Sequence, residues 1–229
     1  MQARGLFTFT ETQKHASLDK VLDRIFQTYR ITRTEYWSFD LYQWRYDLAS
    51  SFNASHEARF FQILHLKSKD GDKASSTETS RNLQQHSASL TLSQMWDKTQ
   101  HLTKKMAGHW TLRPVLTLTN GYFYDVGEFR IRVGEVKKGL HKEPRGVVAM
   151  IEVLPLVGSN QMASEDESSA LANGGVEQDA SAFQELIRAF WNGLGITGAK
   201  EYFREPKCDP ELVHLQEAEL WCEALRLKS

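Results

Sequence analysis

The clearest alternation of apolar and polar positions lies in residues 126–154. Its first half alternates apolar with charged residues, in the order Glu128, Phe129, Arg130, Ile131, Arg132, Val133. This period of two predicts a strand with one face on a core and one in water. Residues 147–154 are apolar almost without a break, which is typical of a strand covered on both faces. We predict that these two strands form the centre of an antiparallel sheet.

Other segments with strand patterns are residues 6–10, 36–46, 60–67 and 112–119. The last of these runs into Asn120-Gly121, a pair that tolerates positive φ and is typical of a two-residue hairpin turn. We therefore expect the chain to reverse at Asn120-Gly121 and to return through Tyr122. Gly127 is predicted to form a bulge in the returning strand.

Helical spacing of apolar residues predicts four helices. The first begins at Ser17 as N-cap, and the second covers residues 90–102 and ends at Gly108. The third opens with Ser181 and Gln184 as a capping box, and the fourth covers residues 211–227 after Asp209-Pro210. Together with the strands, these helices predict an α+β chain.

Two polar segments, at about 68–89 and 156–180, contain few large apolar residues. We predict that both are disordered inserts in a single domain spanning residues 1–229. Because strands outnumber helices and are joined by hairpin-like links, the sheet is predicted to be mostly antiparallel. We expect it to close into a β-barrel flanked by helices, since closure removes exposed edges.

The composition narrows the possible functions. The 229 residues contain 28 Lys plus Arg against 29 Asp plus Glu, so direct nucleic-acid binding is not expected. The two cysteines, Cys208 and Cys222, do not make a disulfide framework. The sequence has no apolar run of the ~20 residues that a membrane helix needs, nor one that resembles a signal peptide. We therefore expect an intracellular protein with no membrane partner.

Sequence motifs for catalysis are missing from the chain, including phosphate-binding glycine loops, the nucleophile elbow and the H-E-x-x-H zinc motif. Glutamates at E-x-E spacing line some metal-dependent phosphohydrolase barrels. Here that spacing occurs at Glu165/Glu167, in a predicted insert, and at Glu217/Glu219, on a predicted helix. We expect no enzyme activity, no cofactor and no metal; a β-barrel metal-dependent phosphohydrolase acting on nucleotide or RNA 5′-phosphates is the alternative.

Two groups of residues are candidates for contact with a partner. One is aromatic: Phe183, Phe190 and Trp191 share one face of the third helix, and Trp221 lies on the fourth. Such residues pack either in a core or in an interface with another subunit, where aromatic side chains are enriched. The other group is the loop between the central strands, which carries Lys137, Lys138, Lys142 and Arg145. This loop is either solvated or in contact with a phosphate or an acidic partner.

Several motifs, taken in order, resemble fungal Mediator subunit 20, the family described as related to the TATA-binding protein. They are Trp37-Ser38-Phe39-Asp40, Leu92-Ser93-x-x-Trp96, the run G-E-F-R-I-R-V-G-E-V at 127–136, G-V-V-x-x-I-E-V at 146–153, and Phe190-Trp191. The resemblance covers most of the chain outside the two polar segments.

The resemblance implies a β-barrel flanked by helices, without catalytic or cofactor residues. It also implies pairing with Mediator subunit 18 and docking through the C-terminal part of subunit 8 onto other head-module subunits. Such a protein is a coactivator in the nucleus that relays activator signals and contacts RNA polymerase II indirectly.

Overall fold

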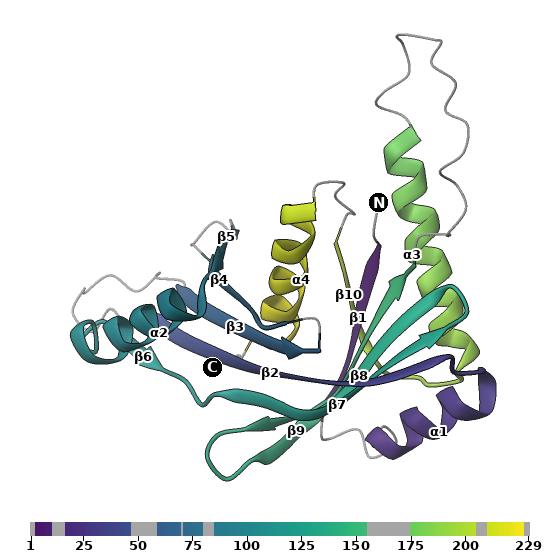
Figure 1. The fold of residues 1–229 in the computed structure, drawn as a ribbon, viewed down its shortest axis with the longest axis horizontal. Helices are drawn as coiled ribbons and strands as arrows, with labels where there is room; N and C mark the ends of the chain where they lie inside the picture. The colour runs from purple at the N-terminus through teal and green to yellow at the C-terminus, as the bar shows by residue number, and fades with distance from the viewer. Residues whose placement is uncertain are drawn as a thin grey trace, which may run out of the picture.

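The computed structural model describes residues 3–10, 17–46, 59–69, 71–79, 85–154, 175–204 and 210–226. These residues form one ten-stranded sheet, four α-helices and a π-helical segment, η1. All of the strand pairs are antiparallel, and helices lie on both faces of the sheet (Figure 1). The α+β class and the antiparallel sheet are therefore confirmed.

The elements follow one another along the chain with these bounds: β1 Arg4–Thr10, α1 Leu18–Thr28, β2 Arg33–Tyr46, β3 Phe60–Ser68, β4 Lys73–Thr79, β5 Gln85–Leu90, α2 Leu92–Gln100, η1 His101–Lys105, β6 Trp110–Leu112, β7 Leu116–Val126, β8 Phe129–Lys138, β9 Glu143–Val153, α3 Gly175–Gly193, β10 Lys200–Phe203 and α4 Pro210–Ala224.

The sheet is open, so the predicted β-barrel is wrong. Its strand order is β10-β1-β9-β8-β7-β2-β3-β4-β5, with β6 paired to β2 beside this path. The terminal strands β10 and β5 are not paired with each other. The sheet bends, so that β1 and β10 lie in one wing and β3, β4 and β5 lie in the other (Figure 1). Helix α4 lies between the two wings and contacts all five of these strands. A helix thus occupies the place where strands would have to meet to close a barrel.

Both faces of the central strands are covered. Helices α1 and α3 pack on one face, over a core that includes Phe7, Ile131 and Ile151. Helix α4 packs on the opposite face, over a core that includes Trp37 and Met150. One face of β8, which carries Arg132, was predicted to be in contact with water. In the middle of the strand this face is buried under α4.

The local signals for helix α1 are confirmed. The Ser17 side chain accepts a hydrogen bond from the backbone N–H of Lys20, at 3.4 Å, as an N-cap does. Val21, Leu22 and Ile25 fall on one face and are buried. Burying three such side chains stabilises the fold by up to about 5–9 kcal/mol before the cost in entropy.

The structure has a strand irregularity where a hairpin turn was predicted, at Asn120-Gly121, and a turn where a bulge was predicted, at Gly127. Asn120-Gly121 lies inside strand β7, where the pairing register shifts against both β2 and β8. The turn is at Gly127, whose φ of 59° joins β7 to β8. Gly121 is needed for space, because a Cβ there would collide with the ring of Trp37.

The structure also differs from the prediction in the two polar segments. Within 68–89, residues 73–79 and 85–90 form strands β4 and β5, and Ser75, Ser76 and Thr77 are buried. Strand β4 buries these hydroxyl groups rather than large apolar side chains, and the side chains of β5 are mostly exposed, so an apolar pattern does not reveal either strand. Helix α3 begins at Gly175, ahead of the predicted capping box at Ser181. The rest of the second segment lies outside the described residues.

Among the described residues, no helix combines the length and the apolar character that crossing a bilayer requires. A single domain over residues 1–229 stays a prediction.

Candidate functional site

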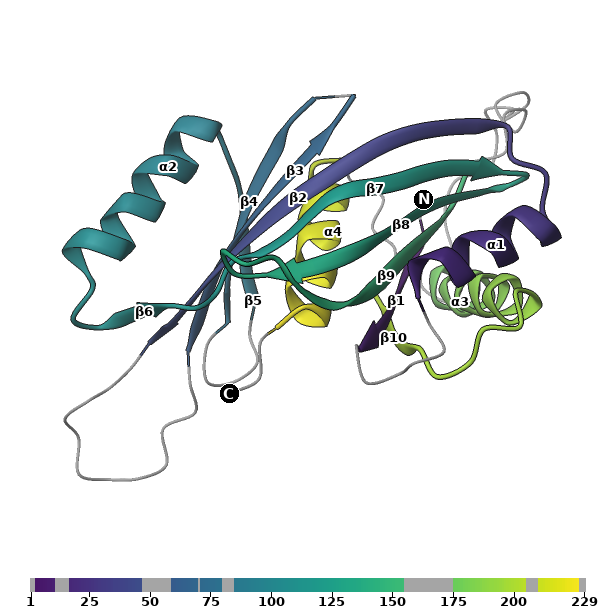
Figure 2. The same ribbon diagram turned by 90° about the horizontal axis from the view of Figure 1, so that it is seen from below.

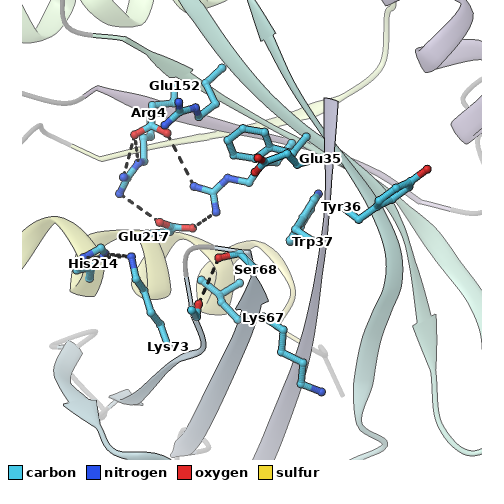
Figure 3. A pocket seen from close by; sticks show the side chains of 15 residues that line it. Arg4, Glu35, Tyr36, Trp37, Lys67, Ser68, Lys73, Glu152, His214 and Glu217 are labelled. Atoms are coloured by element: carbon cyan, nitrogen blue, oxygen red, sulfur yellow. Dashed lines mark hydrogen bonds and ion pairs between the residues drawn. The ribbon is translucent and has the colours of Figure 1, made fainter. Parts of the chain in front are cut away.

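A group of four buried charges lies between α4 and the sheet (Figure 3). Helix α4 contributes Glu217, and the strands contribute Arg4 from β1, Arg132 from β8 and Glu152 from β9. The side chains of Glu152 and Glu217 are 3% and 6% exposed, and those of the arginines 11% and 14%. Two positive and two negative charges thus meet in the interior, and only one of the four comes from the helix.

Each arginine of this group contacts both glutamates. Arg4 Nη2 lies 2.9 Å from Glu152 Oε1, and Arg4 Nη1 lies 3.4 Å from Glu217 Oε2. The guanidinium of Arg132 forms an ion pair with Glu217 and lies 3.9 Å from Glu152. Arg4 Nη1 also donates a hydrogen bond to the backbone carbonyl of Val213 on α4, at 2.9 Å. The four charges therefore connect the helix to three strands of the sheet.

The surrounding charges favour the ionised forms of Glu217 and Arg132. Burial alone would raise the pKa of Glu217, but the charges of Arg132 and Arg4 outweigh it and lower that pKa to about 2. Burial likewise opposes the charge of Arg132, yet Glu217 and Glu152 hold its pKa above the usual arginine value. Breaking such a pair by removing one partner leaves an uncompensated buried charge.

Two buried glutamines hold the other end of the helix. Gln62 Nε2, on β3, donates a hydrogen bond to the Cys222 carbonyl at 3.0 Å. Gln43 Nε2, on β2, donates to the Leu225 carbonyl at 3.3 Å. Carbonyl groups near a helix C-terminus lack helical partners, so these amides satisfy them. Together with Arg4, Arg132, Glu152 and Glu217, the two glutamines form what we call the α4 clamp.

A cavity of about 200 Å³ lies beside the clamp. Lys73 and His214 stand at its edge, with the lysine Nζ 3.4 Å from the histidine Nε2 (Figure 3). Partial burial lowers the pKa of His214, and the charge of Lys73 lowers it further, so the imidazole is neutral at pH 7 and accepts from the lysine. Lys67 on the wall is already paired with Asp40, at 2.6 Å.

The ion pairs of the clamp attach helix α4 to the sheet. Both buried carboxylates face guanidinium groups at ion-pair distance, which leaves them unavailable as ligands for a cation. In the described part of the chain, no group of three or more His, Cys, Asp or Glu residues is arranged to hold a metal ion. Nothing in this geometry favours the alternative of a metal-dependent phosphohydrolase.

The predicted aromatic contact residues lie as follows. Phe190, Trp191 and Trp221 are 5%, 2% and 0% exposed, so they are inside the core of this chain. Trp221 lies 5.4 Å from Trp37, between ring centroids, on the α4 side of the sheet. Phe183 is partly buried at the margin of the core under α3. A partner interface through these residues stays a prediction.

The predicted basic loop is the β8–β9 hairpin, and the structure brings its charges together at one tip. Lys137 and Lys138 end β8, Lys142 lies in the turn with a φ of 52°, and Arg145 follows in β9. Lys137 lies 3.4 Å from Glu135. Contact between this hairpin and a partner also stays a prediction.

The α4 clamp was not predicted from the sequence. A signal was present in Glu152, an acid inside an apolar strand, because a buried carboxylate requires a positive partner. The sequence does not say which of the arginines provides it.

The fold and this site define an α+β scaffold: an open antiparallel sheet, helices on both faces, and internal charges that secure a helix. No curated protein matches the sequence. Among solved structures, the chain matches the PH1819 protein of Pyrococcus horikoshii OT3, which is 12% identical, with a TM-score of 0.43 and coverage of 95% of this chain and 99% of that one. The PH1012 protein of the same organism is 14% identical, with a TM-score of 0.42 and coverage of 86% and 92%.

Residues 1–217 match the family described as TATA-binding related factor (TRF) of subunit 20 of Mediator complex. The chain therefore belongs to the Mediator subunit 20 family. Mediator is a nuclear complex that acts in transcription as a coactivator, so other Mediator subunits are the partners that membership implies.

Proposed function

We propose that this chain is a non-enzymatic subunit of the Mediator head module that pairs with subunit 18 and docks through the C-terminal part of subunit 8. The match to the subunit 20 family over residues 1–217 carries the proposal. In this role the chain works in the nucleus, contacts other head-module subunits and helps to relay activator signals to RNA polymerase II.

The α4 clamp supports a scaffold role. Its charged side chains form ion pairs with one another, such as those of Glu217 with Arg4 and Arg132. A subunit that binds several partners needs a fixed shape, and buried ion pairs between α4 and the sheet help to hold one arrangement of these elements.

Co-expression tests the proposed assembly. The tagged chain is produced with subunit 18, with the C-terminal part of subunit 8, or with both, and complexes are isolated by affinity and size-exclusion chromatography. We expect a stable pair with subunit 18 and a three-part complex when the subunit 8 segment is added. The proposal is wrong if the tagged chain retains neither protein and recovers no Mediator subunits from nuclear extract.

The same assay tests the predicted contact residues. Phe183 and the β8–β9 hairpin are the accessible members of the two groups, so the arms are Phe183→Ala and the pair Lys138→Glu with Lys142→Glu. Each arm lowers recovery of a partner if its residues form the contact. An exposed position elsewhere, Thr28→Ala on α1, serves as the control.

A further inference from the structure

Helix α2 and η1 lie at the opposite end of the sheet from α1 and α3 (Figure 2). Only Met95 of these fourteen residues is fully buried, where it packs with Trp44 and Ile63. The chain continues from α2 into a π-helical turn at His101–Lys105. Turns of this kind are rare and occur frequently at functional sites.

A groove of about 650 Å³ runs beside this segment, and we call it the α2 groove. It is lined by Phe61, Asp97, Lys98, Gln100, His101, Leu102, Lys104 and Lys105. Phe61 and Leu102 are partly buried and supply apolar surface at its base. The volume is within the range of about 300–1,000 Å³ that ligand-binding clefts show.

The charge of the α2 groove is strongly one-sided. Lys98, Lys104 and Lys105 line it, against the single carboxylate of Asp97. Within the described ranges, no carboxylate lies within ion-pair distance of these three lysines. The Nζ of Lys98 lies 5.7 Å from the centre of the Phe61 ring, so positive charge stands directly above apolar surface.

Helix stability accounts for part of this arrangement. Lysines in the last turn of a helix interact favourably with its dipole, which explains Lys104 and Lys105 without a ligand. It does not explain why Phe61 and Leu102 leave apolar surface open between the lysines. Apolar surface beside three lysines that have no ion pair among the described residues fits a partner with the complementary pattern.

We propose that the α2 groove binds a short acidic segment of a partner protein. A large apolar side chain of that segment packs on Phe61 and Leu102, and flanking carboxylates pair with Lys98, Lys104 and Lys105. This assignment goes beyond the proposed function, which places no partner on any surface.

A peptide fits the groove better than a nucleic acid does. Nucleic-acid binding relies on many phosphate contacts over an extended basic surface. Here three lysines surround an apolar base, and the chain as a whole has a net charge of −1. A bulky apolar anchor with a few carboxylates matches both properties of the site.

The test uses a fluorescently labelled synthetic peptide in which Asp and Glu alternate with Leu around one Phe. Binding to the full chain is followed by fluorescence anisotropy at low and physiological salt. We expect saturable binding that weakens about tenfold in the double variant Lys104→Glu with Lys105→Glu. Leu102→Ala weakens binding as well, by removing apolar contact without changing the charge.

The matched control is Lys20→Glu with Arg24→Glu, which makes the same change in charge on exposed positions of α1. We expect this variant to bind the peptide as the unmodified chain does, and thermal melts confirm that both double variants are folded. Equal losses in the two double variants would mean attraction to net charge alone and would overturn the proposal.

Two further arms identify the class of ligand. A peptide with Phe replaced by Ala binds more weakly if the apolar base is used. A single-stranded oligonucleotide that displaces the peptide and binds more tightly than it does would instead assign the α2 groove to nucleic acid. The Lys104→Glu, Lys105→Glu variant is also co-expressed with subunit 18, and retained pairing there separates failure at this groove from failure of the proposed assembly.

Discussion

Aromatic residues of α3 are part of the core that joins this helix to the sheet. The ring of Trp191 stacks on Phe7 of β1, with ring centroids 4.4 Å apart. Its neighbour Phe190 stacks on Tyr29 and lies 4.3 Å from Phe129. Stacked rings add about 0.5–1.5 kcal/mol to the free energy gained from burial. These contacts reach β1, β8 and the C-cap residue of α1, so the side chains of α3 fix its position on the sheet.

We expect Trp191→Ala to lower the free energy of unfolding of the isolated chain by about 3–5 kcal/mol, because it leaves a large cavity against Phe7. Urea denaturation followed by circular dichroism measures the change. Trp96→Ala is the control, since Trp96 is 52% exposed. Unchanged stability of the Trp191 variant together with loss of a partner would place this side chain at an interface instead.

At the scale of elements, strand β7 shows how neighbouring packing overrides a local turn signal. Asn120-Gly121 would form a hairpin turn in isolation. In the chain, the ring of Trp37 covers Gly121, and Trp37 Nε1 donates a hydrogen bond to the Tyr122 carbonyl at 3.1 Å. The glycine therefore provides room for a tryptophan, and strand β7 continues through it.

We expect Gly121→Ala to destabilise the fold by about 1–3 kcal/mol, because the added Cβ displaces the Trp37 ring. Differential scanning calorimetry of the two proteins measures the shift. Gly108→Ala is the control, since a Cβ at Gly108 meets no atom within 4 Å. If the two variants melt alike, the close approach of Trp37 is not needed for stability.

The elements that the sequence predicted are those with a local apolar pattern. Helix α1 and the β8–β9 pair follow from spacings of three to four and of two, which a short window of residues contains. Strand β4 lacks that signal because it buries Ser75, Ser76 and Thr77, and strand β5 lacks it because most of its side chains are exposed. The α4 clamp joins distant residues: Arg4 and Glu152 are 148 positions apart. A window along the chain cannot detect such a pair.

At the scale of the molecule, α4 decides the shape of the sheet. Glu217, in the middle of the helix, pairs with Arg4 of β1 and Arg132 of β8, and carbonyl groups at the C-terminal end accept hydrogen bonds from Gln43 of β2 and Gln62 of β3. Between them, Trp221 packs on Trp37 and Phe39. The two wings are thus held at a fixed opening by a helix, without strand pairing between β10 and β5.

We expect Glu217→Gln to cost about 3 kcal/mol of stability at neutral pH, because it leaves Arg4 and Arg132 with a single buried carboxylate. The pKa of Glu217 falls from 4.5 to about 2 on folding. Its contribution is therefore complete above about pH 4.5 and is lost as the pH falls toward 2. Urea midpoints between pH 2 and 7 measure this loss, which the Gln variant lacks.

Glu223→Gln is the matched control on the same helix. Its carboxylate pairs with Arg204 at 2.6 Å, but both side chains are well exposed, at 42% and 36%. A pair of this kind contributes about 0–1 kcal/mol. Equal acid sensitivity in the unmodified chain and the Glu217 variant would show that the clamp does not depend on this charge.

The position of α4 after all ten strands has a consequence for synthesis on the ribosome. Translation proceeds from the N-terminus, so every strand has been synthesised before the helix that covers Trp37 and Met150. During that interval the apolar face of the nascent sheet is exposed to the cytosol. Until translation reaches Trp221, that surface is open to contact with a chaperone or another polypeptide.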